Sequence, residues 1–200
     1  MHALTPDDLL PLDEYAGRRR EFFEAQCRYL DRYRRVRVGP RAALLFENRQ
    51  TLWFRVQEVL RIARAVEPAL VRRELDLYNR LLPGPDCLQA ALVIEVADEK
   101  RLLEELAPWR ALSGEQVCLV LGPVRCGAEL ITCRPEDRCA GTAHWVQFTL
   151  DPAARALLGD PRHSAHIEIR LDGYQHASSQ LSEDVRQSLL EDLNLSDRTG

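Results

Sequence analysis

One carboxylate stands inside a predicted helix that is apolar almost all round. Glu58 lies four residues from both Phe54 and Ile62, and Arg55 and Arg61 lie three residues on either side of it. Residues three and four apart are neighbours on a helix surface. An isolated charge in apolar surroundings is costly. We therefore expect Glu58 to pair with one of these arginines, to bind a metal, or to act as an acid or base.

Further polar groups lie close to this carboxylate along the chain. Acidic, amide and guanidinium side chains of this kind can bind a polar ligand, and bidentate arginine contacts suit carboxylates and phosphates. A structural ion-pair network that fixes the helix in the core explains the same residues, because perturbed groups mark sites only statistically. The candidate ligand-binding residues are Glu47, Asn48, Arg49, Gln57, Glu58 and Arg61.

Two histidines complete a possible metal site. His144 begins the run HWVQFTL, whose alternation places His144 on the same strand face as Val146, and His176 follows a later strand in a loop. Neutral imidazoles combined with carboxylates suit iron, zinc or manganese. The candidate metal ligands are therefore Glu58, Glu47, His144 and His176, although a histidine on an apolar strand face also serves as a hydrogen-bonded core residue.

Four cysteines, Cys118, Cys126, Cys133 and Cys139, fall within a window of 22 residues. No two of them have the two-residue spacing that is common in structural zinc sites. Cys133 and Cys139 bracket a charged loop and could approach each other as a redox-active pair, or all four could be inert thiols. The chain also lacks a phosphate-binding glycine loop and the motifs HExxH and GxSxG. Whether it is an enzyme stays open.

The elements that must position these groups begin with the helix around Glu58. Asn48 is a good N-cap, so we expect a helix over residues 49–66. Leu52, Val56 and Leu60 follow helical spacing, and Trp53 widens this face, so the helix should be largely buried.

The rest of the chain divides at the breaker that runs from Leu81 to Asp86. We expect a helical part (1–82) and a strand-rich part (86–200) of one domain over residues 1–200. The predicted fold class is α+β, with N-terminal helices around one central buried helix and a mainly antiparallel sheet in the second half. Predicted helices cover residues 13–35, 49–66, 68–81, 98–107, 151–158 and 182–195. Predicted strands cover residues 36–38, 42–46, 88–96, 117–121, 129–133, 144–150 and 166–171.

The composition is that of an ordinary globular protein, with 46% hydrophobic residues, 29% charged residues and a net charge of −4. One segment, residues 18–41, holds nine arginines against three acids. Such a band can attract phosphate, nucleic acid or an acidic partner, or it can be a solvated helix face. We expect no nucleic-acid binding, because no nucleic-acid motif accompanies it. The chain shows no signal peptide and no membrane-length apolar run, so we expect a cytoplasmic protein.

Several short motifs resemble one bacterial protein family. The family is named as domain of unknown function 3501, and the resemblance covers most of the chain. It is most specific over residues 36–61. The matching residues there are Gly39-Pro40, the run from Leu44 to Arg49, Thr51, Gln57-Glu58 and Leu60-Arg61.

The resemblance implies a redox setting. Genes of this family often lie near those for rubrerythrin and for an iron–sulfur oxidoreductase of the heterodisulfide-reductase type. The family also has a histidine before its aromatic-rich strand, which makes His144 the first candidate for a site histidine. Two hypotheses follow. In the first, the chain is an accessory protein of a redox or oxidative-stress system that binds one of these redox partners. In the second, it is a metal- or small-molecule-binding protein, or an enzyme, with its site around Glu58.

Overall fold

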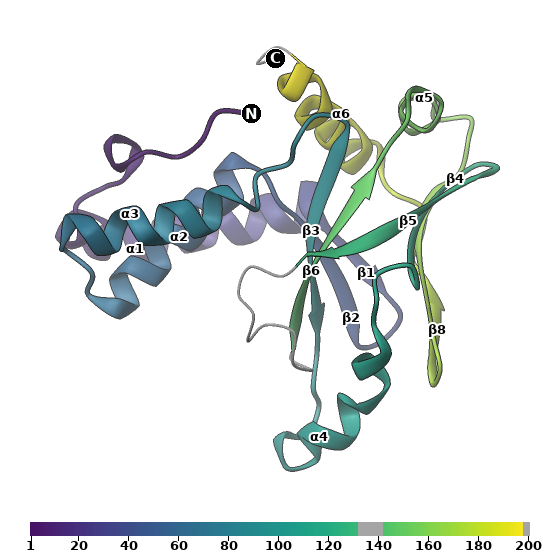
Figure 1. Cartoon of the computed structure of the whole chain (residues 1–200), viewed down its shortest axis with the longest axis horizontal. Coiled ribbons are helices and arrows are strands. Elements are labelled where there is room, and N and C mark those ends of the chain that lie inside the picture. The colour runs from purple at the N-terminus through teal and green to yellow at the C-terminus, as the bar shows by residue number, and fades with distance from the viewer. Residues whose placement is uncertain (132–141, 198–200) are drawn as a thin grey trace.

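The computed structural model describes residues 1–131 and 142–197. In this part of the chain an eight-stranded antiparallel sheet carries an arm of three helices (Figure 1). The spatial order of the strands is β1-β2-β3-β6-β5-β4-β7-β8. The strands are β1 (Arg35–Val38), β2 (Ala42–Phe46), β3 (Cys87–Ile94), β4 (Val117–Leu121), β5 (Val124–Ile131), β6 (Ala143–Thr149), β7 (Ala165–Leu171) and β8 (Tyr174–Ala177).

The helices fall into two groups. The arm consists of α1 (Leu12–Tyr29), α2 (Arg49–Ala63) and α3 (Pro68–Asn79), and it projects from the sheet in Figure 1. A π-helical turn, η2 (Leu30–Arg34), extends α1 to the start of β1. The helices that lie against the sheet are α5 (Pro152–Gly159) and α6 (Glu183–Asp197), and the short α4 (Leu102–Glu105) lies between two 3-10 turns in the connection from β3 to β4.

The sheet curls until its two edge strands approach each other, so it nearly forms a barrel. Tyr174 on β8 donates a hydrogen bond from Oη to the carbonyl of Val38 on β1. The same Oη accepts a hydrogen bond of 3.2 Å from the backbone N–H of Arg41. His176 packs against the β1–β2 turn, where a Cβ at Gly39 (φ +69°) would lie 2.4 Å from its Cγ. Tyr174 therefore bridges the seam between the two edges.

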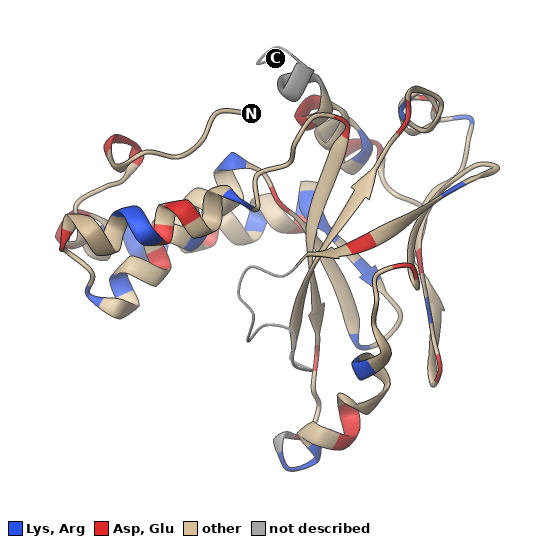
Figure 2. Cartoon of the chain, in the orientation of Figure 1, with Lys and Arg blue, Asp and Glu red and all other residues tan. Residues whose placement is uncertain are grey.

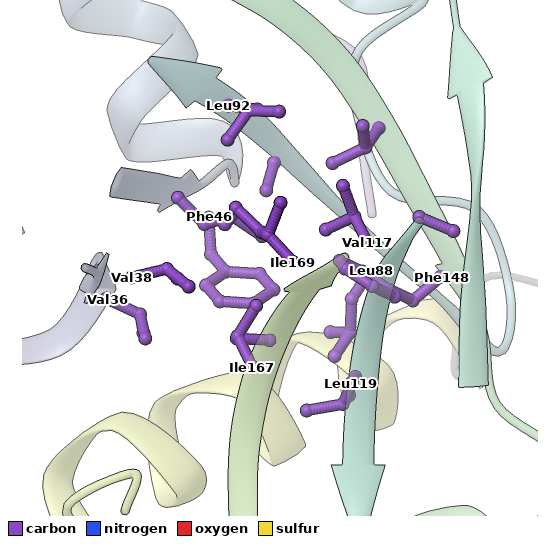
Figure 3. Packing of buried hydrophobic residues seen from close by; sticks show 14 of the residues in the cluster. Val36, Val38, Phe46, Leu88, Leu92, Val117, Leu119, Phe148, Ile167 and Ile169 are labelled. Atoms are coloured by element: carbon purple, nitrogen blue, oxygen red, sulfur yellow. The ribbon is translucent and has the colours of Figure 1, made fainter. Parts of the chain in front are cut away.

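The inward side chains of the strands form the main hydrophobic core. Figure 3 shows Phe46, Leu88, Phe148 and Ile167 packed together in the middle of the curled sheet. These residues alternate with outward residues along each strand, as the pleat requires. α6 contributes further apolar side chains to this core, Val185, Leu189 and Leu193.

The helical arm has a second apolar core of its own. Leu52, Val56 and Leu60 of α2 pack with Leu75 of α3 and with Leu4 near the N-terminus. The Asn48 side chain caps α2 by accepting hydrogen bonds from the backbone N–H groups of residues 50 and 51. α2 lies between α1 and α3, so its two sides face different helices.

The predicted α+β class and the antiparallel pairing are confirmed, with corrections to the detail. The sheet is not confined to the second half of the chain, because β1 and β2 join β3 in the same sheet. α2 ends at Ala63, three residues earlier than predicted, because Arg64 adopts a left-handed conformation (φ +49°). α2 is not buried all round, since Ile62 is 70% exposed.

Two other segments differ from prediction. The stretch expected as one helix over residues 98–107 is broken into short 3-10 turns around the single turn α4. The stretch expected as a loop around His176 is the edge strand β8. No helix in the described ranges combines the length and the apolar character needed to cross a membrane.

Candidate functional site

Glu58 lies at the contact between α1 and α2 and is fully engaged by neighbouring side chains. Arg19 of α1 donates to its carboxylate from Nη2 at 2.9 Å, and Arg61 donates from Nε at 3.1 Å. Tyr15 donates from Oη at 3.0 Å. Of the outcomes expected for Glu58, the structure shows the arginine pair. The expected partner Arg61 is present, but Arg55 is not part of the cluster and Arg19 replaces it.

This environment fixes the ionisation of the cluster. Burial alone would raise the pKa of Glu58, but the hydrogen bonds from Arg19, Arg61 and Tyr15 outweigh it and lower the pKa to about 2. Burial and the adjacent carboxylate raise the pKa of Tyr15 well above its usual range. Glu58 therefore stays ionised near neutral pH and is a poor general base.

Glu47 forms a second buried cluster, just before α2. Its side chain is 1% exposed and lies 2.7 Å from Nη2 of Arg55, which is about two turns further along, on α2. Thr51 donates a short hydrogen bond to the same carboxylate. The Arg55 guanidinium stacks over the ring of Trp145 on β6, 5.1 Å from its centroid. Glu47 and Arg55 thus join the start of α2 to the outer face of the sheet.

Asn48 connects this cluster to a third one. Its Nδ2 donates to Oη of Tyr29 at 2.9 Å and to Oδ1 of Asp192 at 3.5 Å. Asp192 forms a bidentate ion pair with Arg34, and their side chains are 4% and 2% exposed. Burial raises the pKa of the Asp192 carboxyl, while Arg34 and Asn48 act to lower it. Asn48 is therefore both a helix cap and part of a buried polar network.

Sequence reasoning missed most of this network. In the sequence, Arg34 lies in the basic segment of residues 18–41, and Asp192 lies in the helix predicted over residues 182–195. One signal could have identified Asp192: it is three residues from Leu189 and one from Leu193, and both leucines are fully buried. An acid within the apolar stripe of an amphipathic helix needs a buried partner. Nothing in the sequence indicates that this partner is Arg34.

The remaining ligand candidates contact the segment before α1. Arg49 lies 2.6 Å from the carboxylate of Asp8, and this guanidinium lowers the pKa of Asp8. Gln57 is fully buried and donates from Nε2 to the carbonyl of Leu10 at 3.4 Å. The Gln57 Oε1 has no hydrogen-bond partner among the described residues. The six candidates therefore divide into separate contacts around α2 instead of one pocket.

The four candidate metal ligands are dispersed. His144 faces the barrel core opposite Leu92, as the strand alternation predicted, and is 7% exposed. His176 stacks on Tyr174 at the seam, with the ring centroids 4.5 Å apart. Glu58 faces α1, and Glu47 faces Arg55. Residues 1–131 and 142–197 contain no cluster of three histidine, cysteine or acidic residues that could hold a metal ion.

The two cysteines proposed as a redox pair, Cys133 and Cys139, lie outside the described residues. Cys118 and Cys126 are free thiols on adjacent strands. Cys118 pairs with Gly127, and Cys126 pairs with Leu119, so the two thiols point to opposite faces of the sheet. The pair Cys118 and Cys126 is therefore not placed to form a disulfide in this fold.

The basic band at residues 18–41 is largely neutralised within the chain. Eight of its nine arginines form ion pairs with acids, several of them distant in sequence. Arg32 pairs with Asp184 of α6, and Arg37 pairs with Glu95. Blue and red segments accordingly alternate along the arm in Figure 2. This compensation weakens the attraction of the band for a polyanion.

A groove lies between residues 6–13 and the end of α2 with the start of α3. Its volume is about 580 Å³, which is within the range of ligand-binding clefts. Leu60, Ala65, Val66 and Val71 line one side, and residues 6 and 9–13 line the other. The adjoining corner between α2 and α3 exposes Ile62, Val66 and Leu70, which are 70%, 73% and 43% exposed.

The comparisons with known proteins agree with the resemblance noted in the sequence. No curated protein is significantly similar to the chain. A crystal structure of a novel protein of unknown function from Burkholderia pseudomallei K96243 is similar, with a TM-score of 0.84 and 28% identity. The similarity covers 96% of this chain and 100% of that one. The family profile described as "Protein of unknown function (DUF3501)" matches residues 3–193. Since this match spans nearly the whole sequence, the chain belongs to the DUF3501 family.

Proposed function

We propose that the chain is a non-catalytic accessory protein that acts by binding another protein at the corner between α2 and α3. The observation that carries this proposal is the exposure of Ile62, Val66 and Leu70 next to an apolar groove. Exposed apolar side chains that gather beside a groove are typical of interaction sites, whereas isolated ones are not. A partner could contact the exposed side chains of the corner and also insert a side chain into the groove.

The polar clusters support a binding role over a catalytic one. Glu58, Glu47 and Asp192 each have an arginine as their main partner inside the chain. A general acid or base needs a pKa near the working pH and access to a substrate. The low pKa of Glu58 and the burial of Glu47 and Asp192 favour structural roles for these carboxylates.

The charges around the corner are balanced. Arg64, Arg72 and Arg73 are exposed and form no ion pair within the described ranges, and the acids Glu67, Glu74 and Asp76 lie among or beside them in the sequence. The corner therefore favours an apolar partner segment over one of a particular charge. The family resemblance directs the choice of partner to rubrerythrin or to an iron–sulfur oxidoreductase.

Binding of purified partners tests this proposal. Rubrerythrin and the iron–sulfur oxidoreductase from the same genome are immobilised, and the chain is passed over them in a biolayer interferometry experiment. We expect Val66→Asp to weaken binding at least tenfold, because it places a charge in the apolar contact. Leu103→Asp on α4 is the matched control, since Leu103 is 71% exposed and lies away from the groove. Equal binding by Val66→Asp and wild type, or no binding to either protein, contradicts the proposal.

A second candidate function is the binding of a small molecule in the same groove. The observation that favours it is Gln57, a fully buried amide whose oxygen lacks a partner in the described ranges and whose nitrogen bonds to Leu10 on the groove wall. A ligand with an N–H or O–H donor would satisfy this oxygen. A compound that raises the melting temperature of wild type, but not of Gln57→Leu, would support this function. Near-stoichiometric iron, zinc or manganese in purified protein would instead favour metal binding.

A further inference from the structure

Residues 4–10, which we call the strap, lie across the helical arm and are held by side chains of α2 and α3. Leu4 is 3% exposed and packs in the apolar core of the arm. The Asn79 side chain binds both backbone groups of Leu4, accepting from its N–H at 2.8 Å and donating to its carbonyl at 2.9 Å. Trp53 donates from Nε1 to the carbonyl of Asp8 at 2.9 Å. The Asn79 amide therefore makes the two backbone hydrogen bonds to Leu4 that a residue of a neighbouring β-strand would make.

Two further polar contacts hold the strap against the arm. The Asp8 carboxylate accepts hydrogen bonds from Thr5 and forms an ion pair with Arg49 at 2.6 Å. The Leu10 carbonyl accepts a hydrogen bond from Gln57. Four of these five polar contacts with the arm therefore involve only backbone atoms of the strap. The strap side chains that the arm contacts are Leu4 in its apolar core, Leu9 packed against that core, and Asp8, four residues after Leu4, paired with Arg49.

We infer that α2 and α3 form a peptide-binding site that the chain fills with its own strap, and that the partner displaces the strap with a segment of the same chemistry. Such a segment carries an apolar residue followed four residues later by an aspartate or glutamate. This inference rests on the proposed function and specifies how that surface is regulated. The residues that contact Leu4, Asp8 and Leu10 lie 75, 45 and 47 positions away in sequence. A segment of a separate chain can therefore take the place of the strap and present the same backbone groups to them.

The exposed corner beside the strap identifies a different protein, rather than a second copy of this chain, as the occupant. A strap exchanged from a second copy would restore the same contacts, including the groove wall that residues 6, 9 and 10 form, and would leave Val66 exposed. A longer segment from another protein covers the strap site and the corner together. The strap, because it is covalently attached, competes at a high effective concentration. The partner therefore binds only in proportion to the fraction of molecules with the strap open.

A labelled peptide tests the site independently of the redox partner. The peptide carries residues 2–11 of the chain, and its fluorescence anisotropy is measured as full-length protein is added. We expect weak binding to wild type, because the attached strap occupies the site. Leu4→Asp in the protein releases the strap, and we expect it to bind the wild-type peptide at least tenfold more tightly. A peptide with the same Leu4→Asp change should not bind, and Leu103→Asp protein should behave as wild type.

Asp8→Asn protein provides a second way to free the strap, since it removes the Arg49 ion pair and leaves the apolar core of the arm intact. If Leu4→Asp does not fold, tighter peptide binding by Asp8→Asn still supports the inference. A folded variant that binds the peptide no better than wild type overturns it. A wild-type dimer in solution that Leu4→Asp abolishes assigns the site to a second copy and overturns the choice of partner.

The two proposals can fail separately. Peptide binding without binding to either redox protein leaves the strap site standing and contradicts the proposed function. Partner binding that is sensitive to Val66→Asp, without peptide binding to either strap variant, shows that the strap is a fixed part of the fold.

Discussion

Arg34 and Asp192 are 158 residues apart in the chain, yet they form a bidentate ion pair that is almost completely buried. The pair joins the π-helical turn after α1 to the last helix, α6. Tyr29 and Asn48 provide additional hydrogen bonds to it. The helical arm and the helix that closes the barrel core therefore meet at a buried charged contact.

Asp192→Ala should lower the free energy of unfolding by about 3–5 kcal/mol, because it leaves the Arg34 charge buried without its partner. Urea unfolding, followed by circular dichroism, measures the change. Asp184→Ala is a matched control, since the Arg32–Asp184 pair joins the same two elements but its side chains are 63% and 48% exposed. We expect this control to cost no more than about 1 kcal/mol. Similar losses for both variants would contradict the structural role of the buried pair.

The Glu58 cluster should make stability depend on pH in the acid range. The pKa of Glu58 is about 2 in the folded chain, below its ordinary value of 4.5. A lowered pKa stabilises the fold above the unfolded value, and this stabilisation is lost as the pH falls from about 4.5 to about 2. The contribution at neutral pH is at most ~3 kcal/mol. Glu58→Gln should therefore be less stable than wild type at pH 7, and the gap should shrink towards pH 2. A constant gap in urea unfolding across this range would contradict the assignment.

Tyr174→Phe tests the seam of the barrel. It removes the hydroxyl that binds the Val38 carbonyl and the Arg41 N–H, at an expected cost of about 1–3 kcal/mol. Hydrogen exchange measured by NMR should show faster exchange of the Arg41 amide. The amide of Leu119, a fully buried position on the central strand β4, serves as the internal reference. Unchanged exchange at Arg41 would show that other contacts hold the edges together.

Gln57→Met should be neutral or stabilise the fold by up to ~1 kcal/mol, although Gln57 is fully buried. The substitution keeps the length of the side chain and removes an amide oxygen that has no partner in the described ranges, together with a hydrogen bond of 3.4 Å. Thermal and urea unfolding measure the effect. A loss of more than about 2 kcal/mol would show that the amide is satisfied in solution, for example by buried water.

Local signals in the sequence predicted the elements around the site well. Asn48 marked the start of α2, and the strands predicted over residues 36–38 and 42–46 correspond to β1 and β2. These signals depend on a few adjacent residues, so they can be recognised in the sequence without knowledge of the tertiary structure. β8 was missed because its residues, Tyr174–Ala177, are mostly polar and exposed, and because pairing with β7, not an apolar pattern, makes them a strand.

The partners of the charged residues could not be predicted in the same way. Arg61, three residues from Glu58 on the same helix, was found, whereas Arg19 belongs to another helix. Arg55 stands as close in sequence to Glu58 as Arg61 does, but it turns to Glu47. Helical spacing shows which side chains can meet within one helix. Which of them do meet is decided by the packing of α1 and of the sheet against α2.

The near closure of the sheet also bears on how the chain behaves at high concentration. The edge strands β1 and β8 have four residues each, and β1 carries Arg35 and Arg37. Long, uncharged edges act as templates on which strands of other molecules add, whereas short and charged edges do not. Tyr174 brings these two edges together, so little backbone is free for such addition. A variant that opens the seam would therefore expose more edge backbone, and its short, charged edges would be what remains to oppose strand addition.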